Sequence, residues 1–123
     1  MPRFVVHEHK AKRAGLHYDL RIEVGDHLES YACRKGLPLV PGVKRLLIRQ
    51  VDHEKWWLNF EGEIKEGYGQ GTLKIWDKGT YKELSNKKNV RVLEFHGKKL
   101  KGLYVLVKLG SSSDSYIIFK KKS

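Results

Sequence analysis

Residues 16–23, with the sequence Leu-His-Tyr-Asp-Leu-Arg-Ile-Glu, alternate between apolar and polar side chains without interruption. A period of two is typical of a β-strand with one face against a hydrophobic core. The apolar side carries Leu16, Tyr18, Leu20 and Ile22, and the polar side carries His17, Asp19, Arg21 and Glu23. An imidazole, a carboxylate and a guanidinium in one row are unusual for a solvated strand face. The stretch therefore predicts a central strand and makes its polar face a candidate functional site.

The rest of the chain shows short strand patterns separated by turn residues. Strands are predicted at 4–9, 28–32, 44–51, 71–76, 80–84, 90–95, 102–109 and 116–119, with turns or loops at 24–27, 36–42 and 61–71, a strand break at 52–55 and a hairpin turn at 77–79. In the strand at 44–51, Leu46 and Ile48 are the expected core residues, and Leu47 fits less regularly. Residues 56–60 form an aromatic patch.

This spacing, with no amphipathic helix, predicts an all-β, mainly antiparallel fold. A small closed β-barrel with long loops and at most short helices is favoured over a sandwich, because closure removes edge strands. Residues 1–123 are expected to form a single domain, with residues 1–3 and 120–123 as frayed tails.

The charge balance predicts a polyanionic partner. Lys and Arg number 25 against 14 Asp and Glu, a net charge of +11, and neutralising phosphates releases counterions. The single cysteine, Cys33, excludes an internal disulfide and fits a reducing compartment. No apolar run approaches the roughly 18–20 residues of a membrane-spanning helix, and the N-terminus lacks a signal-peptide core. A cytoplasmic location without membrane contact is therefore expected.

The histidines allow a metal site of a reactive kind. Neither Cys-x-x-Cys nor His-Glu-x-x-His occurs, which excludes the common structural zinc motifs. If the strand at 4–9 neighbours the central strand, His9 can stand beside His17 and Asp19. Two imidazoles and a carboxylate with open positions suit Mn²⁺, Fe²⁺ or Zn²⁺. The residues alone also allow the plainer interpretation of a wet strand face with an Asp–Arg pair.

A series of segments carries a family resemblance. They are 4–9 and 16–23, then Arg34-Lys35-Gly36, Val43-Lys44-Arg45-Leu46, Asp52-His53, Phe60-Glu61-Gly62 and Ile75-Trp76-Asp77-Lys78-Gly79. In this order, over nearly the whole chain, they resemble the 3′-phosphoesterase domain of bacterial and archaeal DNA ligase D, here expected as a stand-alone protein. The resemblance implies a compact β-barrel that heals 3′ ends during end joining.

The resemblance also implies the activity and its partners. Two steps are expected: removal of a terminal 3′ ribonucleoside to leave a 3′-phosphate, and hydrolysis of that phosphate to a 3′-OH. The substrate would be DNA or a primer–template, and DNA ligase, polymerase/primase and Ku would be separate proteins. The default oligomeric state is a monomer.

The site residues follow from the same resemblance. His9, His17 and Asp19 match the family's ligands of a divalent metal, most often Mn²⁺, with Zn²⁺ or Co²⁺ as alternatives; His7 competes with His9. The positions that engage the scissile phosphate or support the site are matched by Arg21, Lys35, Arg45 and His53. Arginine offers two parallel donors to a phosphate, which lysine cannot. His53 is either a general acid or a plain phosphate contact.

Three departures from the family pattern bear on these roles. The 9–17 loop is longer than usual, the 66–71 loop is shorter, and Trp57 stands where a phosphate-binding tyrosine is common. Trp57 and Tyr68 are assigned to nucleic-acid binding. The main rival hypothesis is a non-catalytic nucleic-acid-binding β-barrel that stacks bases on its aromatic residues. A weaker one is a cupin-like metalloenzyme for small molecules, against which the net charge argues.

Overall fold

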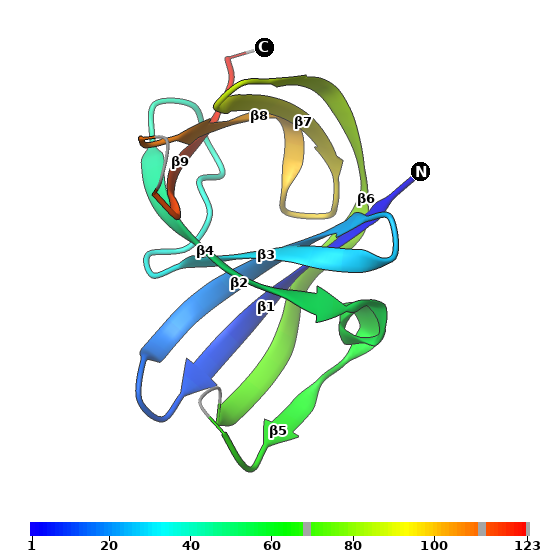
Figure 1. The fold of residues 1–123 in the computed structure, drawn as a ribbon, viewed down its shortest axis with the longest axis vertical. Coiled ribbons are helices and arrows are strands. Elements are labelled where there is room, and N and C mark those ends of the chain that lie inside the picture. The colour runs from blue at the N-terminus through cyan, green and yellow to red at the C-terminus, as the bar shows by residue number, and fades with distance from the viewer. Residues whose placement is uncertain (68–69, 111–112, 123) are drawn as a thin grey trace.

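A computed structural model describes residues 1–67, 70–110 and 113–122. Its elements are β1 (Arg3–Ala11), β2 (Gly15–Val24), β3 (His27–Cys33), β4 (Lys44–Glu54), the 3₁₀ helix η1 (Lys55–Asn59), β5 (Gly62–Ile64), β6 (Gly71–Lys87), β7 (Val90–His96), β8 (Lys101–Lys108) and β9 (Ser115–Lys120) (Figure 1). The described residues contain no α-helix, and none of their helical structure could cross a membrane.

The strands form one antiparallel sheet that closes on itself (Figure 1). The neighbours run β1-β2-β3-β4-β9-β8-β7-β6, and an additional pairing between β1 and β6 completes a ring of hydrogen-bonded strands. The short β5 pairs with the beginning of β6. The expected all-β, antiparallel class is confirmed, and the expected closure takes the form of this ring.

The β1–β2–β3 part of the sheet buries side chains on both faces. Phe4, Leu20 and Tyr31 belong to the main core. On the opposite face Val5 and Leu28 pack with Leu58 of η1 in a second, smaller core. The polar row of β2 lies on this second face, where η1 and the chain after it lie over the sheet. Asp19, Arg21 and Glu23 are therefore buried and His17 is half-buried, which excludes a wet strand face.

The structure corrects the predicted hairpin around 77–79, because β6 runs through these residues as one strand. Asp77 is buried, and its carboxylate accepts backbone N–H groups of Lys98, Lys99 and Leu100 at 2.8–3.0 Å. A Cβ added at Gly97 would collide with this carboxylate. The Asp-Lys-Gly sequence thus orders a turn elsewhere in the chain instead of making one itself.

Strand β4 also differs from prediction. It continues through the predicted break at 52–55 as far as Glu54. Its core residue is Leu47, which is fully buried, whereas Leu46 and Ile48 are 50% and 37% exposed. The inversion has a physical reason: the face that carries Leu46 and Ile48 borders a cleft and not the main core.

Two residues that were expected in frayed tails lie in strands. Arg3 lies in β1, where its side chain and backbone N–H bind the Glu23 carboxylate, and Lys120 lies in β9. Conversely, Leu16 is 51% exposed. It lies at the beginning of β2, which projects beyond the core that the apolar side of the strand was expected to join.

Asp77→Ala is expected to lower the free energy of unfolding by about 3 kcal/mol, because it removes the acceptor of three backbone donors at the 97–100 turn. Denaturant titration followed by tryptophan fluorescence measures the change. Exposed Asp114 provides the control: Asp114→Ala should change stability far less. Equal stability of the Asp77→Ala variant and the wild type would contradict this role.

Candidate functional site

The pairing of β1 with β2 brings His9, His17 and Asp19 together. His9 on β1 lies directly opposite His17 on β2, and His7 lies opposite Asp19. Because side chains alternate along each strand, His7, His9, His17 and Asp19 all project from the face opposite the main core. The condition for bringing His9 beside His17 and Asp19, that the first strand neighbours the central strand, is therefore met.

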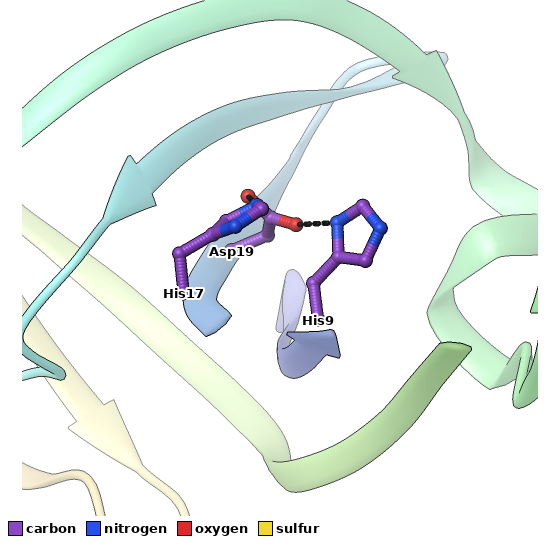
Figure 2. Close-up of side chains that lie close together, drawn as sticks. All are labelled: His9, His17 and Asp19. Atoms are coloured by element: carbon purple, nitrogen blue, oxygen red, sulfur yellow. Dashed lines mark hydrogen bonds and ion pairs between the residues drawn. The ribbon is translucent and has the colours of Figure 1, made fainter. Parts of the chain in front are cut away.

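Asp19 lies between two histidines (Figure 2). His9 Nδ1 is 3.2 Å from Asp19 Oδ2, and His17 Nε2 is 3.3 Å from Asp19 Oδ1. One ligand atom from each residue lies within 4.8 Å of the others. Two ligands on one divalent ion with bonds of about 2.1 Å are roughly 3.0–3.4 Å apart. Each histidine lies within this range of one Asp19 oxygen, although the two histidines approach different oxygens. His17 Nδ1 donates to the Gly15 carbonyl at 3.2 Å, which leaves Nε2 to face Asp19.

Electrostatics keep the Asp19 carboxylate ionised. Burial alone would raise its pKa, but hydrogen bonds with His17 and His9 and the charge of Arg21 outweigh burial and hold the pKa well below its usual range. Conversely, the hydrogen bond with Asp19 raises the pKa of His17. The centre is thus built around a buried negative charge that attracts a cation, whether a proton or a metal ion.

His7 has a different role from its neighbour. Its Nδ1 accepts a hydrogen bond from Arg21 Nε at 3.1 Å, and its Nε2 donates to the Phe60 carbonyl at 2.9 Å. Burial, followed by the charge of Arg21, lowers the pKa of His7 to about 4. His7 is therefore neutral, and both of its ring nitrogens are engaged. This geometry favours His9 over the competing His7 as a ligand.

Arg21 is held on several sides. Besides the bond to His7, its Nη1 donates to Ser30 Oγ at 3.1 Å and its Nη2 to Asp19 Oδ2 at 3.4 Å. The side chain is only 4% exposed. A guanidinium has five N–H donors in a rigid plane. Three of them are used at these positions and a fourth, on Nη1, points to His53 Nε2 at 3.5 Å, so the Nη edge retains one N–H, on Nη2, for a bound anion.

His53 lies beside this edge. Its Nδ1 donates to the Val51 carbonyl at 2.8 Å and lies 3.1 Å from Ser30 Oγ, while its Nε2 lies 3.5 Å from Arg21 Nη1. Burial, followed by the charge of Arg21, lowers the pKa of His53. The neutral ring therefore directs the lone pair of Nε2 toward the N–H of Arg21 Nη1. An anion bound at the same edge would favour the protonated ring.

A β-bulge aims His53 into the cleft. Gln50 pairs with Ser30 and His53 pairs with Leu28, so β4 has two residues between these pairs where β3 has one. The extra residue inverts the alternation of side chains. As a result, His53 faces the same side as Gln50, whereas a regular strand would turn it to the opposite side.

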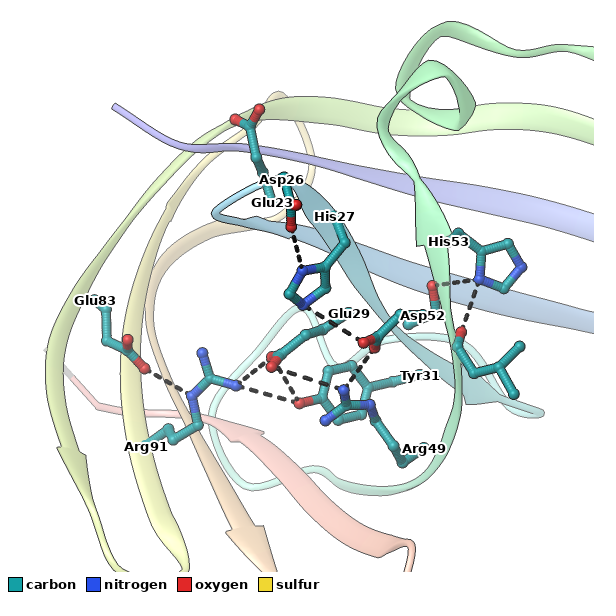
Figure 3. Close-up of polar contacts among 12 residues, drawn as sticks. Glu23, Asp26, His27, Glu29, Tyr31, Arg49, Asp52, His53, Glu83 and Arg91 are labelled. Atoms are coloured by element: carbon teal, nitrogen blue, oxygen red, sulfur yellow. Dashed lines mark hydrogen bonds and ion pairs between the residues drawn. The ribbon is translucent and has the colours of Figure 1, made fainter.

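An ion pair spans this bulge. Arg49 Nη2 donates to Asp52 Oδ1 at 2.8 Å, and Asp52 points away from His53 (Figure 3). Behind it, Glu29 accepts from Arg91 Nη1 at 2.8 Å, and Arg49 Nη2 lies 3.7 Å from Glu29. These contacts tie β4 to β3 and β7 on the side away from the cleft.

The predicted site residues share one cleft of about 770 Å³. His9, His17, Asp19, Arg21, Lys35, Arg45, His53 and Trp57 all line it. Lys35 is exposed and Arg45 half-buried, and Arg45 Nε is buried with no hydrogen-bond partner among the described residues. In the described part of the chain, no hydrogen bond or ion pair joins either residue to the three-residue centre. Arg34 and Lys44 also line the cleft, so four cations gather where β3 has just ended and β4 begins, and we call this part the basic end.

The two aromatic residues predicted to bind nucleic acid are described to different extents. Trp57 stacks on Trp56 with ring centroids 4.5 Å apart, meets His53 edge-on at 5.5 Å and lies 5.5 Å from the Arg21 guanidinium. It packs against His53 and Arg21 as an aromatic wall of the cleft. Tyr68 lies outside the described residues.

Sequence reasoning missed Ser30, a fully buried residue that bridges Arg21 and His53. A signal was present: with the tight turn at 24–27, antiparallel register pairs Arg21 with Ser30. The bridge to His53 had no such signal, because it depends on the β4 bulge.

Comparison with known proteins identifies relatives of the whole chain. The family model of the DNA ligase D 3′-phosphoesterase domain matches residues 7–108. The multifunctional non-homologous end joining protein LigD of Mycolicibacterium smegmatis is 38% identical over 85% of this chain, and that of Pseudomonas aeruginosa is 35% identical over 98%. The LigD DNA repair protein of Mycobacterium tuberculosis is 34% identical over 98%. The match spans only 15–16% of the length of these relatives.

Asp19→Asn and His17→Ala are each expected to lower Mn²⁺ affinity more than about 100-fold, because each removes a donor or its charge, whereas His7→Gln should cost less than about tenfold. Isothermal titration calorimetry with Mn²⁺, Zn²⁺ and Co²⁺ measures the affinities. Loss of binding in His7→Gln together with full binding in His9→Ala would reverse the ligand assignment.

Asp52→Ala is expected to release the bulge and weaken the contact between His53 and Trp57. The Arg49–Asp52 ion pair is partly exposed, so its loss should lower the free energy of unfolding by less than about 1 kcal/mol. Nuclear Overhauser effects between the two rings report the contact. Asp26→Ala removes a carboxylate near His27 but not at the bulge, and serves as the control. Unchanged ring contacts in the Asp52→Ala variant would show that the ion pair does not position His53.

Proposed function

Because this chain belongs to the DNA ligase D 3′-phosphoesterase family, we propose that it is a metal-dependent hydrolase that heals the 3′ ends of DNA. The observation that carries the proposal is the buried His9–His17–Asp19 centre next to the Arg21 Nη edge, inside a cleft of a strongly basic chain. A cation site and a guanidinium side by side are what a phosphoryl group requires.

The proposed substrate is a DNA or primer–template strand that ends in a 3′ ribonucleotide or a 3′-phosphate. In the first step, water adds to phosphorus and the bond from phosphorus to the O5′ of the terminal nucleoside breaks. The nucleoside leaves with a proton on O5′, and the strand keeps a 3′-phosphate. In the second step, water adds again, the bond to O3′ breaks, and inorganic phosphate and a 3′-OH result.

His9, His17 and Asp19 would hold the divalent ion, and Mn²⁺ is the proposed metal, with Zn²⁺ or Co²⁺ as alternatives. The donor set and the two Asp19 distances fit such an ion. When bound, the ion supplies positive charge to the phosphoryl oxygens and acidifies water.

The chain's own residues complete the site. Arg21, held by His7, Ser30 and Asp19, presents its Nη edge to the non-bridging oxygens without reorganising. His53 is positioned at this edge to bind the phosphate, and the anion would raise its pKa enough for it to donate a proton to the departing oxygen. Arg45 and Lys35 add positive charge at the basic end of the cleft, toward the phosphates of the strand.

The relatives are named for non-homologous end joining, so we place the reaction in that process, in the cytoplasm. DNA ligase, polymerase and Ku are the proposed protein partners, and the enzyme is proposed to act as a monomer. After healing, a strand carries the 3′-OH that a ligase or polymerase needs.

The test uses a labelled primer–template with one 3′ ribonucleotide and a matched 3′-phosphate substrate, each with Mn²⁺ or EDTA. Metal-dependent conversion to a 3′-phosphate and then a 3′-OH is expected. His17→Ala and Asp19→Ala should lower kcat/KM at least about 10³-fold, because they remove metal ligands, whereas His96→Ala, at an exposed histidine, should retain wild-type rates. Arg21→Lys should lose activity because one ammonium cannot replace the two-pronged contact.

The same experiment distinguishes the enzyme from the rival hypothesis of a non-catalytic nucleic-acid-binding β-barrel. Binding that weakens steeply as salt rises, without conversion of either substrate under any metal, would leave a nucleic-acid-binding module and refute the enzyme. Full activity of the Asp19→Ala variant in metal-stripped buffer would refute the metal centre.

A further inference from the structure

One wall of the cleft consists of exposed apolar side chains. Leu46, Ile48 and Val51 of β4 are 50%, 37% and 79% exposed, and all three line the cleft. We call these three residues the β4 shelf. Exposed aliphatic residues gathered beside a catalytic centre need a reason in a chain of net charge +11, because water contact with them is unfavourable.

Strand register places the shelf beside the metal centre. Asp19 pairs with Ala32 on β3, and Ala32 pairs with Ile48 on β4. With neighbouring strands about 4.8 Å apart, the Ile48 backbone lies roughly 10 Å from that of Asp19. Ala32, the residue between them, also lines the cleft, and its methyl group leaves room above the sheet. The space is bounded by the metal centre on one side and by Ile48 on the other.

The charges of the cleft differ from one part to another. Arg34, Lys35, Lys44 and Arg45 form its basic end, whereas the β4 shelf offers no charge. A strand that remains after cleavage carries one phosphate per nucleotide and is drawn to the cations. The terminal nucleoside has no phosphate beyond its own 5′ linkage. It therefore presents only a base and a sugar, which suit an apolar surface.

We propose that the β4 shelf, with Ala32 as its floor, is the subsite for the terminal nucleoside that leaves in the first step. This inference rests on the proposed function and assigns one of its two steps to particular residues. The second step has no nucleoside beyond the phosphate, so it does not use the shelf. The shelf thereby discriminates between the two substrates of one centre.

The experiment compares kcat/KM for the two substrates in the wild type, in Ile48→Ser and in Leu46→Ser. Each variant is expected to lower the first step roughly tenfold, as for lost contacts in a hydrophobic pocket, and to lower the ratio of first to second step by the same factor. Val90→Ser is the matched control, because Val90 is β-branched and 37% exposed like Ile48 but does not line the cleft. Thermal unfolding confirms that each variant is folded.

A second substrate tests the contact directly. A primer that ends in a 3′ ribose without its base should lose about the same factor in the wild type, and Ile48→Ser should then add little further loss. Equal losses in both steps would place the retained strand on the shelf and overturn the inference. Losses no larger than in Val90→Ser would overturn it as well. Failure of the proposed function is distinguishable, because the wild type would then convert neither substrate.

Discussion

The buried contact between Asp19 and Arg21 is the interaction on which the rest of this site depends. An isolated charge at this depth would be strongly unfavourable, so each must be compensated within the fold. Asp19 is compensated by His9, His17 and Arg21. Arg21 is in turn held by His7 and Ser30. A rigid cluster results, in which the three candidate metal ligands and the Nη edge of Arg21 are already oriented before any ligand arrives. Such preorganisation is the main source of electrostatic stabilisation in an active site.

The cluster needs strands that depart from regular alternation. In β4 the bulge after Gln50 lets His53 face the cleft, while Asp52 turns to Arg49 on the other side. A second irregularity occurs where β1 pairs with β6: Val6 lies opposite Asp77 and His7 opposite Ile75, so Trp76 is the extra residue. Bulges of this kind re-aim side chains near functional sites. Here they allow one sheet to serve a hydrophobic core and a polar centre on opposite faces.

Two wrong predictions, the hairpin at 77–79 and the core positions of β4, arise because contacts with distant parts of the chain override local sequence preference. The Asp-Lys-Gly run at 77–79 has ideal turn composition, yet Asp77 binds the backbone of the 97–100 turn and the strand continues. Leu46 and Ile48 appeared to be core residues because apolar side chains usually are, but their face borders the cleft and Leu47 occupies the core. Local propensity describes what a residue can do. It does not contain the distant partner that selects among the choices.

The sequence by itself determined the antiparallel all-β class, the central strand with its His17–Asp19–Arg21 row and the family of the chain. These follow from a period of two, from the spacing of turn residues and from the order of motifs along the chain. All three can be read without knowing which strands are neighbours in space. Only the tertiary structure decided that this row is buried, that His7 holds Arg21 with both its nitrogens engaged, and that Ser30 and His53 meet it. Those contacts join residues up to 53 positions apart, and they exist because ring closure and the β4 bulge bring distant strands onto one face.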